Sequence, residues 1–180
     1  LALTAAAGGD IHVTAGGSMT LNSVAAGGYA VTLAADGPML DGNTTTMNIT
    51  ADAINLSARQ IGAPSDHIET AVSEMTLFAS NGGIYIDNAS SDLELYSAEA
   101  VGADGDVGIT STGNISLGEI TAEGDNVVLE AGGAITGGNG TDVDITAASL
   151  TITAPDGISY QLVYDVSGPV TADGGATDVV

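Results

Sequence analysis

Aliphatic residues alternate with polar or small residues in short runs along most of the chain. A period of two is typical of a β-strand with one buried face, and Gly, Asn or Asp, which favour turns, bound each run. The pattern predicts an all-β protein built from many short strands. The expected inward pairs are Ile11/Val13, Met19/Leu21, Val31/Leu33, Met47/Ile49, Ile54/Leu56, Met75/Leu77, Ile84/Ile86, Leu93/Leu95, Val107/Ile109, Ile115/Leu117, Val127/Leu129, Val143/Ile145 and Leu150/Ile152.

The chain contains a long internal duplication. Residues 10–58 align without a gap on residues 106–154, with about a third of the positions identical and the apolar pairs coinciding. Strands recur every seven to twelve residues within a copy, so about three strands make a turn of about 20 to 25 residues. This spacing is expected of a parallel β-helix. The whole chain, 1–180, is predicted to be one β-solenoid segment of a longer chain, with about eight coils.

Composition agrees with a narrow interior. Hydrophobic residues make up 44% of the sequence but aromatic residues only 3%, and there are 26 glycines. Val, Ile, Leu and Ala fill the thin interior of stacked coils, and Gly and Asn provide the backbone conformations that corners need. The alternate positions, such as His12, Thr32, Asn48, Asn55 and Asp144, are expected to face outward.

The charge balance excludes several classes of function. Asp and Glu number 23 against one basic residue, Arg59, and the formal net charge is -22. Such a chain repels nucleic-acid phosphates and anionic membrane surfaces. The absence of Cys removes disulfides and thiolate chemistry but leaves the redox compartment open. No apolar run is long enough to cross a bilayer, so membrane insertion is not expected.

Three stretches carry a family resemblance. GDIHVTAGGSMTL, the stretch from GNISLGEITAEG to ITAPDGI, and IETAVSEMTLFASNGGIYIDNASSDLEL resemble modules of filamentous-haemagglutinin-like exoproteins and adhesins, which bacteria export by two-partner (type V) secretion. The likeness covers the chain up to about Ile158, and its motifs are degenerate. The resemblance implies a right-handed parallel β-helix stalk on or outside the cell surface. The amino-terminal secretion domain of that family is not in this sequence, so the route is inferred.

Catalysis is not expected. β-Helix lyases and glycosidases need a basic residue or clustered carboxylates with shifted pKa values. Arg59 has no basic neighbour, and His12 and His67 are far apart in sequence. A solvated surface role is the simpler interpretation of both histidines.

Calcium is the one cofactor that the sequence suggests. The run Gly137 to Asp142 matches the start of a calcium-binding nonapeptide repeat, although Asp144 stands where that repeat has an apolar residue. Asp104 and Asp106 form a second acidic turn. The candidate ligands are therefore Asp104, Asp106 and Asp142, and a Gly-rich corner without an ion is the alternative.

Two tyrosines are candidates for glycan contact. Tyr85 lies between Ile84 and Ile86, and Tyr96 follows Leu95, so both rings are expected to face outward, where they could stack on sugar rings. Tyr29, at a Gly-rich turn, could do the same. Scattered surface tyrosines without a ligand are the alternative.

Two stretches depart from the short-strand pattern. Residues 65–75 combine Asp66 and Glu69 at capping-box spacing with apolar residues at helical intervals, which permits a short helical turn, with an extended loop as the alternative. Residues 158–166 alternate over a longer stretch than any other. They predict a long strand at the margin of the solenoid, or a wider coil that holds two tyrosine rings.

The sequence as a whole predicts a non-enzymatic stalk or filament segment of a secreted or cell-surface bacterial adhesin. The partners expected are neighbouring coils or subunits of the same exoprotein and host or matrix glycans and proteins. A calcium-dependent glycan-binding module is the alternative function, and a polysaccharide-active β-helix enzyme is the third.

Overall fold

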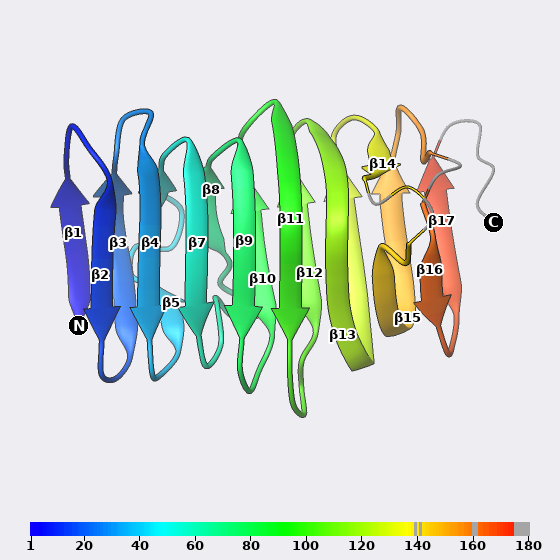
Figure 1. Cartoon of the computed structure of the whole chain (residues 1–180), viewed down its shortest axis with the longest axis horizontal. Helices are drawn as coiled ribbons and strands as arrows, with labels where there is room; N and C mark the ends of the chain where they lie inside the picture. Colours follow the sequence, from blue (N-terminus) through cyan, green and yellow to red (C-terminus); the bar gives the residue numbers. More distant parts are fainter. Residues whose placement is uncertain (139, 141, 160–161, 175–180) are drawn as a thin grey trace.

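The computed structural model is a β-solenoid of about eight coils (Figure 1). It describes residues 1–138, 140, 142–159 and 162–174, and within these ranges there is no helix. The strands are β1 Ala2–Ala6, β2 Ile11–Ala15, β3 Met19–Ala25, β4 Ala30–Ala35, β5 Met39–Asp41, β6 Ile49–Thr50, β7 Ala53–Ala58, β8 Ile68–Ala71, β9 Glu74–Ala79, β10 Ile84–Asn88, β11 Asp92–Ala100, β12 Val107–Ser111, β13 Asn114–Ala131, β14 Ile135–Gly137, β15 Ile145–Ala154, β16 Tyr164–Val166 and β17 Val170–Gly174.

Two hydrogen-bonded walls run along the solenoid, and all the pairings between strands are parallel. Wall 1 contains β1, β3, β5, β6, β8, β10, β12, the second half of β13, the second half of β15, and β17. Wall 2 contains β2, β4, β7, β9, β11, the first half of β13, β14, the first half of β15, and β16. The chain alternates between the walls, so each coil contributes one level to both. Figure 1 shows β4, β7, β9 and β11 of wall 2 in front of β8, β10 and β12 of wall 1.

A single aliphatic core fills the space between the walls. Every second strand residue points inward, and Leu21, Leu33, Ile86 and Leu117 are among the side chains with no exposed surface. Many of them stack on an aliphatic residue of the next coil, as Leu33 does on Leu56 and Ile86 does on Ile109. Burial of this apolar surface is the main source of stability for stacked coils, because no single coil has a core of its own.

The solenoid bends in wall 1 near its start and in wall 2 further along. In wall 1, β3 skips Asn22 in its pairing with β1, and the next level is divided into β5 and β6. Further along, the bend lies in wall 2, where β11 skips Tyr96 and its partner β13 skips Gly118. The duplicated copies explain the change: Asn22 aligns with Gly118, and the second copy enters the solenoid half a coil out of phase with the first.

Residues 65–75 do not form a helical turn. A β-turn links Ala63 and Asp66 by backbone hydrogen bonds in both directions, at 2.9 and 3.0 Å, and β8 and β9 follow. The capping-box spacing was misleading here, because the extended chain of β8 pairs with β6 on one side and β10 on the other. These ladder bonds outweigh a weak local helix preference.

The alternation predicted around Met47/Ile49 and Val143/Ile145 is wrong. Ile49 and Ile145 are buried as expected, but Met47 is only half-buried. Asn48 and Asp144, expected to face outward, are fully buried, while Val143 is 41% exposed. Each polar residue directly precedes a strand, β6 or β15, and so stands at the base of the connection from the strand before it. The Asn48 Oδ1 atom accepts a hydrogen bond from the Glu69 N–H at 2.8 Å, and the Asp144 Oδ2 atom accepts one from the Val163 N–H at 2.8 Å.

The described part of residues 158–166 does not form one long strand. Ile158 forms an isolated parallel bridge with Ile135, a turn bond joins the Leu162 N–H to the Ser159 carbonyl, and β16 covers only Tyr164–Val166. Ile158 and Leu162 are buried. Tyr160 lies outside the described residues, so the wider coil with two rings stays a prediction.

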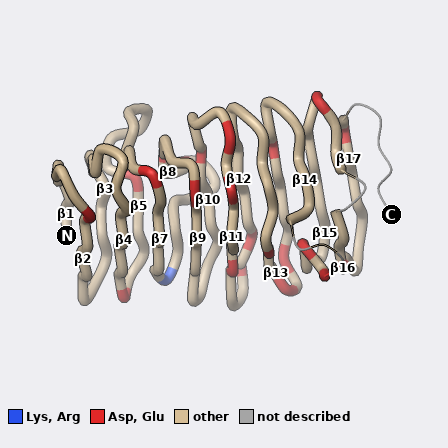
Figure 2. The backbone as a smooth tube through the Cα atoms, turned by 45° about the horizontal axis from the view of Figure 1, so that its top comes forward, with Lys and Arg blue, Asp and Glu red and all other residues tan. Residues whose placement is uncertain are grey.

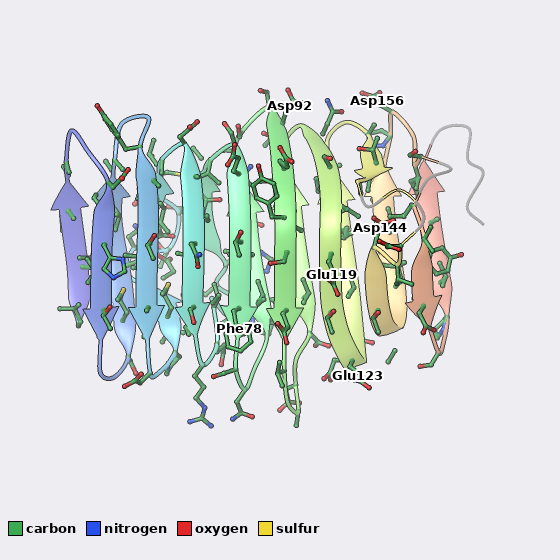
Figure 3. The ribbon with its side chains drawn as sticks, in the orientation of Figure 1. Phe78, Asp92, Glu119, Glu123, Asp144 and Asp156 are labelled. Atoms are coloured by element: carbon green, nitrogen blue, oxygen red, sulfur yellow. The ribbon has the colours of Figure 1, made fainter. Side chains whose placement is uncertain are left out.

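Acidic side chains coat the outside and the rims. Figure 2 shows Asp and Glu spread along the length of the solenoid, with the single basic residue at one rim near β7. In Figure 3, Asp92 and Asp156 lie at one rim and Glu123 at the opposite rim. This distribution fits a solvated surface more closely than one focused acidic site.

Candidate functional site

Three successive corners between wall 2 and wall 1 become longer from one coil to the next. Ala58, Ala79 and Ala100 end three stacked strands in register, and wall 1 resumes at Ile61, Ile84 and Val107. The connecting corners are therefore residues 59–60, 80–83 and 101–106. The longest corner projects below β11 in Figure 1. A short corner beside two longer ones leaves a recess on the rim.

This recess, the corner hollow, has a volume of about 610 Å³. Its only basic group is Arg59, which is exposed. With its amide oxygen turned toward Arg59, Asn81 accepts hydrogen bonds from Nη2 and Nε of the guanidinium at 3.0 and 3.2 Å. The lining residues of the corner hollow are Pro38, Arg59, Gln60, Pro64, Asn81, Gly82, Gly83, Tyr85, Ala103 and Asp104.

The Tyr85 ring lies over glycine backbone. A Cβ atom at Gly83 would stand 2.6 Å from Tyr85 Cε2, and one at Gly108, the partner of Tyr85 in the next coil, would stand 3.3 Å from Cδ1. Burial, helped by the carboxylates of Asp106 and nearby acids, raises the pKa of the Tyr85 phenol. The phenol is therefore neutral and able to donate a hydrogen bond at physiological pH.

A second, smaller hollow lies beside the first and shares Pro64 with it. His67 Nδ1 is 2.8 Å from Asp87 Oδ1, and the His67 ring lies 5.8 Å from the Tyr85 ring, centre to centre. Burial raises the pKa of Glu69, and the nearby carboxylates of Asp41, Asp87 and others raise it further. This hollow is lined by an acidic group of side chains with one histidine.

Asp41 organises the loop that closes the second hollow. Its carboxylate accepts hydrogen bonds from the N–H groups of Asn43 and Thr44 and from the Asn48 amide. Burial raises the pKa of Asp41, but these bonds lower it more, so the pKa lies below its ordinary value. A carboxylate bonded in this way acts as part of the framework and is not available to a ligand.

The predicted calcium ligands lie in two separate places. Asp104 and Asp106 belong to the corner of residues 101–106, whereas Asp142 lies in the loop between β14 and β15. Asp106 Oδ1 accepts hydrogen bonds from both the backbone N–H and the side chain of Asn126, each at 2.9 Å. Among the residues that the structure describes, no three His, Cys, Asp or Glu side chains are grouped so as to hold a metal ion. Calcium binding at these residues stays a prediction.

The other candidate residues are spread over the surface. Tyr96 is the extra residue at the bend of β11 and is 49% exposed on wall 2, away from Tyr85 on wall 1. Tyr29 is also exposed. His12 faces outward from β2 in wall 2 and His67 precedes β8 in wall 1, so the two histidines do not share a site.

Sequence reasoning found Tyr85 and Asp104 but did not connect them, and it missed Gln60 and Asn81. It considered Arg59 only as a possible catalytic base and found no basic neighbour for it. The sequence signal for the recess was the number of residues between each buried alanine and the next inward aliphatic residue. This number increases along the three corners. The recess follows from that growth once the coils are stacked.

Comparisons with known proteins give no relative. No protein-family model matches the chain, and no curated protein or solved structure is significantly similar to it. In the described part of the chain, no helix has the length and apolar character needed to span a bilayer.

Proposed function

We propose that the chain is a non-enzymatic structural segment of a secreted or cell-surface bacterial adhesin or extracellular filament. The observation that carries this proposal is the unbroken stacking of about eight coils over one aliphatic core, with parallel hydrogen bonds from β1 to β17. A solenoid of this kind lengthens by about 4.8 Å for each coil added. Such an element is suited to hold a distal region away from a surface.

The outside of the solenoid supports the same proposal. Small polar residues and acids cover the walls, as in the wall 1 row Glu69, Asp87, Thr110, Glu130 and Thr153, in which each residue pairs with the next. Like charges along such rows disfavour lateral clumping of neighbouring rods. The resemblance to filamentous-haemagglutinin-like exoproteins supports the cell-surface location, the adhesive role and the bacterial origin.

The absence of enzymatic activity is part of the proposal. Glycosidases of the common type use a raised-pKa acid and a second carboxylate across a substrate cleft. Glu69 has the raised pKa, but it lies beside the framework carboxylate Asp41, and the hollow that it lines has a volume of only about 250 Å³. This arrangement supports a structural role for the acid better than a catalytic one.

Electron microscopy of the full-length parent protein tests the proposal. We expect a rod of constant width in which this region adds about 40 Å, at about 4.8 Å for each coil. Deleting a whole number of coils should shorten the rod by about 4.8 Å for each coil deleted, without changing its width. A compact globular particle, or an activity on polysaccharides that depends on Glu69, would contradict the proposal.

A further inference from the structure

The corner hollow has the size of a small-molecule site. Its volume of about 610 Å³ lies within the usual range of roughly 300–1,000 Å³ for ligand pockets. The long corner of residues 101–106 forms one side, and the short corner of residues 59–60 forms the other. Between them the base is glycine, Gly82 and Gly83, so that a ligand can approach the backbone closely.

The hollow combines one aromatic surface with several planar polar groups. Tyr85 provides an apolar ring with a hydroxyl at its edge, and it lies over Gly83 and Gly108, which have no side chains to cover it. Arg59 and the Asn81 amide supply donors, and the Asp104 carboxylate supplies acceptors. A flat apolar ring beside convergent donors and acceptors complements a molecule with an apolar face and a rim of hydroxyl groups.

Rigid supports hold these groups in place. The Asn81 N–H donates to the Arg59 carbonyl at 3.0 Å, and the Asn81 side chain bonds the guanidinium, so two consecutive corners are joined. On the other side of Asn81, Gly102 has a φ of 94°, and a Cβ there would stand 2.8 Å from the Asn81 side-chain amide. Gln60 is fixed by its bond to the Gly62 carbonyl at 2.8 Å. Preorganised groups of this kind lose little freedom on binding.

Charge selects the class of ligand. The carboxylates of Asp106, Asp104 and Asp125 all act on the Tyr85 phenol, and the whole chain has a net charge of -22, so an anionic ligand is repelled. Arg59 bonds the neutral Asn81 amide, so its positive charge is not cancelled by that partner and opposes a cation in the hollow. A neutral, hydroxyl-rich ligand meets neither penalty.

We infer that the corner hollow binds a neutral hexopyranose of a glycan, with one sugar face on the Tyr85 ring and its hydroxyl groups bonded by Arg59, Asn81 and Asp104. This role goes beyond that of a structural segment, and it requires no metal ion. Loss of the Tyr85 ring removes the stacking surface, so binding of the sugar should weaken at least about tenfold, which corresponds to about 1.4 kcal/mol.

Calorimetric titration of the chain with neutral gluco-, manno- and galacto-configured trisaccharides tests the inference. We expect at least one to bind, Tyr85→Ala and Asn81→Ala to weaken it at least about tenfold, and Tyr85→Phe to retain most of it. Tyr96→Ala is the matched control, because it removes an exposed tyrosine on wall 2 and should leave the affinity unchanged. Thermal melting of each variant checks that the solenoid is still folded.

Several outcomes would overturn the inference. They are no binding of any neutral trisaccharide at millimolar concentration, equal weakening by Tyr96→Ala, and full affinity in folded Tyr85→Ala. Tyr85-dependent binding of spermine in place of a neutral sugar would mean that the hollow binds a cation. Tyr85-dependent binding of trigalacturonate would mean that it binds an anion. Loss of binding in EDTA would assign it to a calcium-bridged site. None of these results bears on the rod seen by microscopy, so the two proposals fail separately.

Discussion

The two copies of the duplicated segment, residues 10–58 and 106–154, have the same strand pattern but lie on opposite walls. β2 and β4 of the first copy belong to wall 2, whereas the aligned β12 and the second half of β13 belong to wall 1. The shift between the copies is 96 residues, or about four and a half coils of about 21 residues. The alternation of inward and outward residues is therefore satisfied by either wall, and the walls are interchangeable scaffolds.

The copies differ in how they fix the loop-base residue that directly precedes β6 in the first copy and β15 in the second. In the first copy, Asn48 bonds three partners: it accepts from Glu69 N–H and donates to the Leu21 carbonyl and to Asp41. In the second copy, Gly137 replaces Asp41, and Asp144 replaces Asn48 as the acceptor, in this case for the Val163 N–H. The same backbone requirement is met by the Asn48 amide in one copy and by the Asp144 carboxylate in the other.

Truncation of an aligned pair of core residues should have the largest effect. Leu33 and Leu129 occupy equivalent positions and neither has any exposed surface. Leu33→Ala and Leu129→Ala should each lower the free energy of unfolding by about 2–5 kcal/mol, and by similar amounts, because the two walls are equivalent. Urea denaturation of each variant measures the loss.

The outward neighbours Thr32 and Val128 provide the controls for this pair. Thr32→Ala and Val128→Ala should change the free energy of unfolding by no more than about 0.5 kcal/mol. A core loss confined to one copy would mean that only one wall supports the solenoid. In a repeat protein that unfolds in parts, hydrogen exchange locates the coils affected.

Exchanging the two loop-base residues should separate the copies. Asn48→Asp places a second buried carboxylate where the Asn48 Nδ2 atom lies 2.5 Å from Asp41 Oδ1, and it should cost about 3 kcal/mol at neutral pH. Asp144→Asn keeps an oxygen acceptor for the Val163 N–H and should change the stability by about 1 kcal/mol or less. Urea denaturation at neutral pH measures both.

The pH dependence identifies the cause of the Asn48→Asp defect. The pKa of Asp41 is below its ordinary value of 3.8, so its stabilising contribution is present above pH 3.8 and is lost as the pH falls through the lower folded-state pKa. In the variant the two adjacent carboxylates raise the pKa of one of the pair, so the defect should shrink at a higher pH than this range, as the pair takes up its first proton. Adding Asp41→Asn should rescue the variant at neutral pH. A defect that is independent of pH and is not rescued would contradict the charge explanation.

The strand pattern could be predicted because it depends on burial alone. Leu33 and Leu129 lie inward as the period of two requires, and the spacing of the strands within each copy indicated the coil length. The predictions failed at Asn48, Asp144 and the β8 region, where a side chain or a neighbouring strand meets the hydrogen-bonding needs of the backbone. Such needs depend on the next coil, about 20 residues away, and local spacing does not contain them.

The corner hollow depends on the same long-range information. Outward exposure of Tyr85 followed from Ile84 and Ile86, but its neighbours Arg59, Asn81 and Asp104 come from three different corners. Their proximity arises only after the coils are stacked in register. A pattern that sets the register of strands therefore fixes the scaffold, whereas unequal corner lengths create the surface features on it.

Added salt should stabilise the two copies to different extents, and this difference is smaller than the effects of the substitutions above. The first copy contains four acidic residues and the second contains seven, and neither contains Lys or Arg. Raising the ionic strength from about 0.01 M to about 1 M shortens the Debye length from about 30 Å to about 3 Å and so removes most of the repulsion between exposed carboxylates. We expect the melting temperature to rise and amide exchange to slow more in β12–β15 than in β2–β7. The difference should be about 0.5 kcal/mol, because each exposed charge contributes little.

Sucrose, which stabilises without screening charge, should slow exchange equally in both copies. Equal slowing by salt would mean that the acidic coat does not set the local stability, and that the copies differ only at their loop bases.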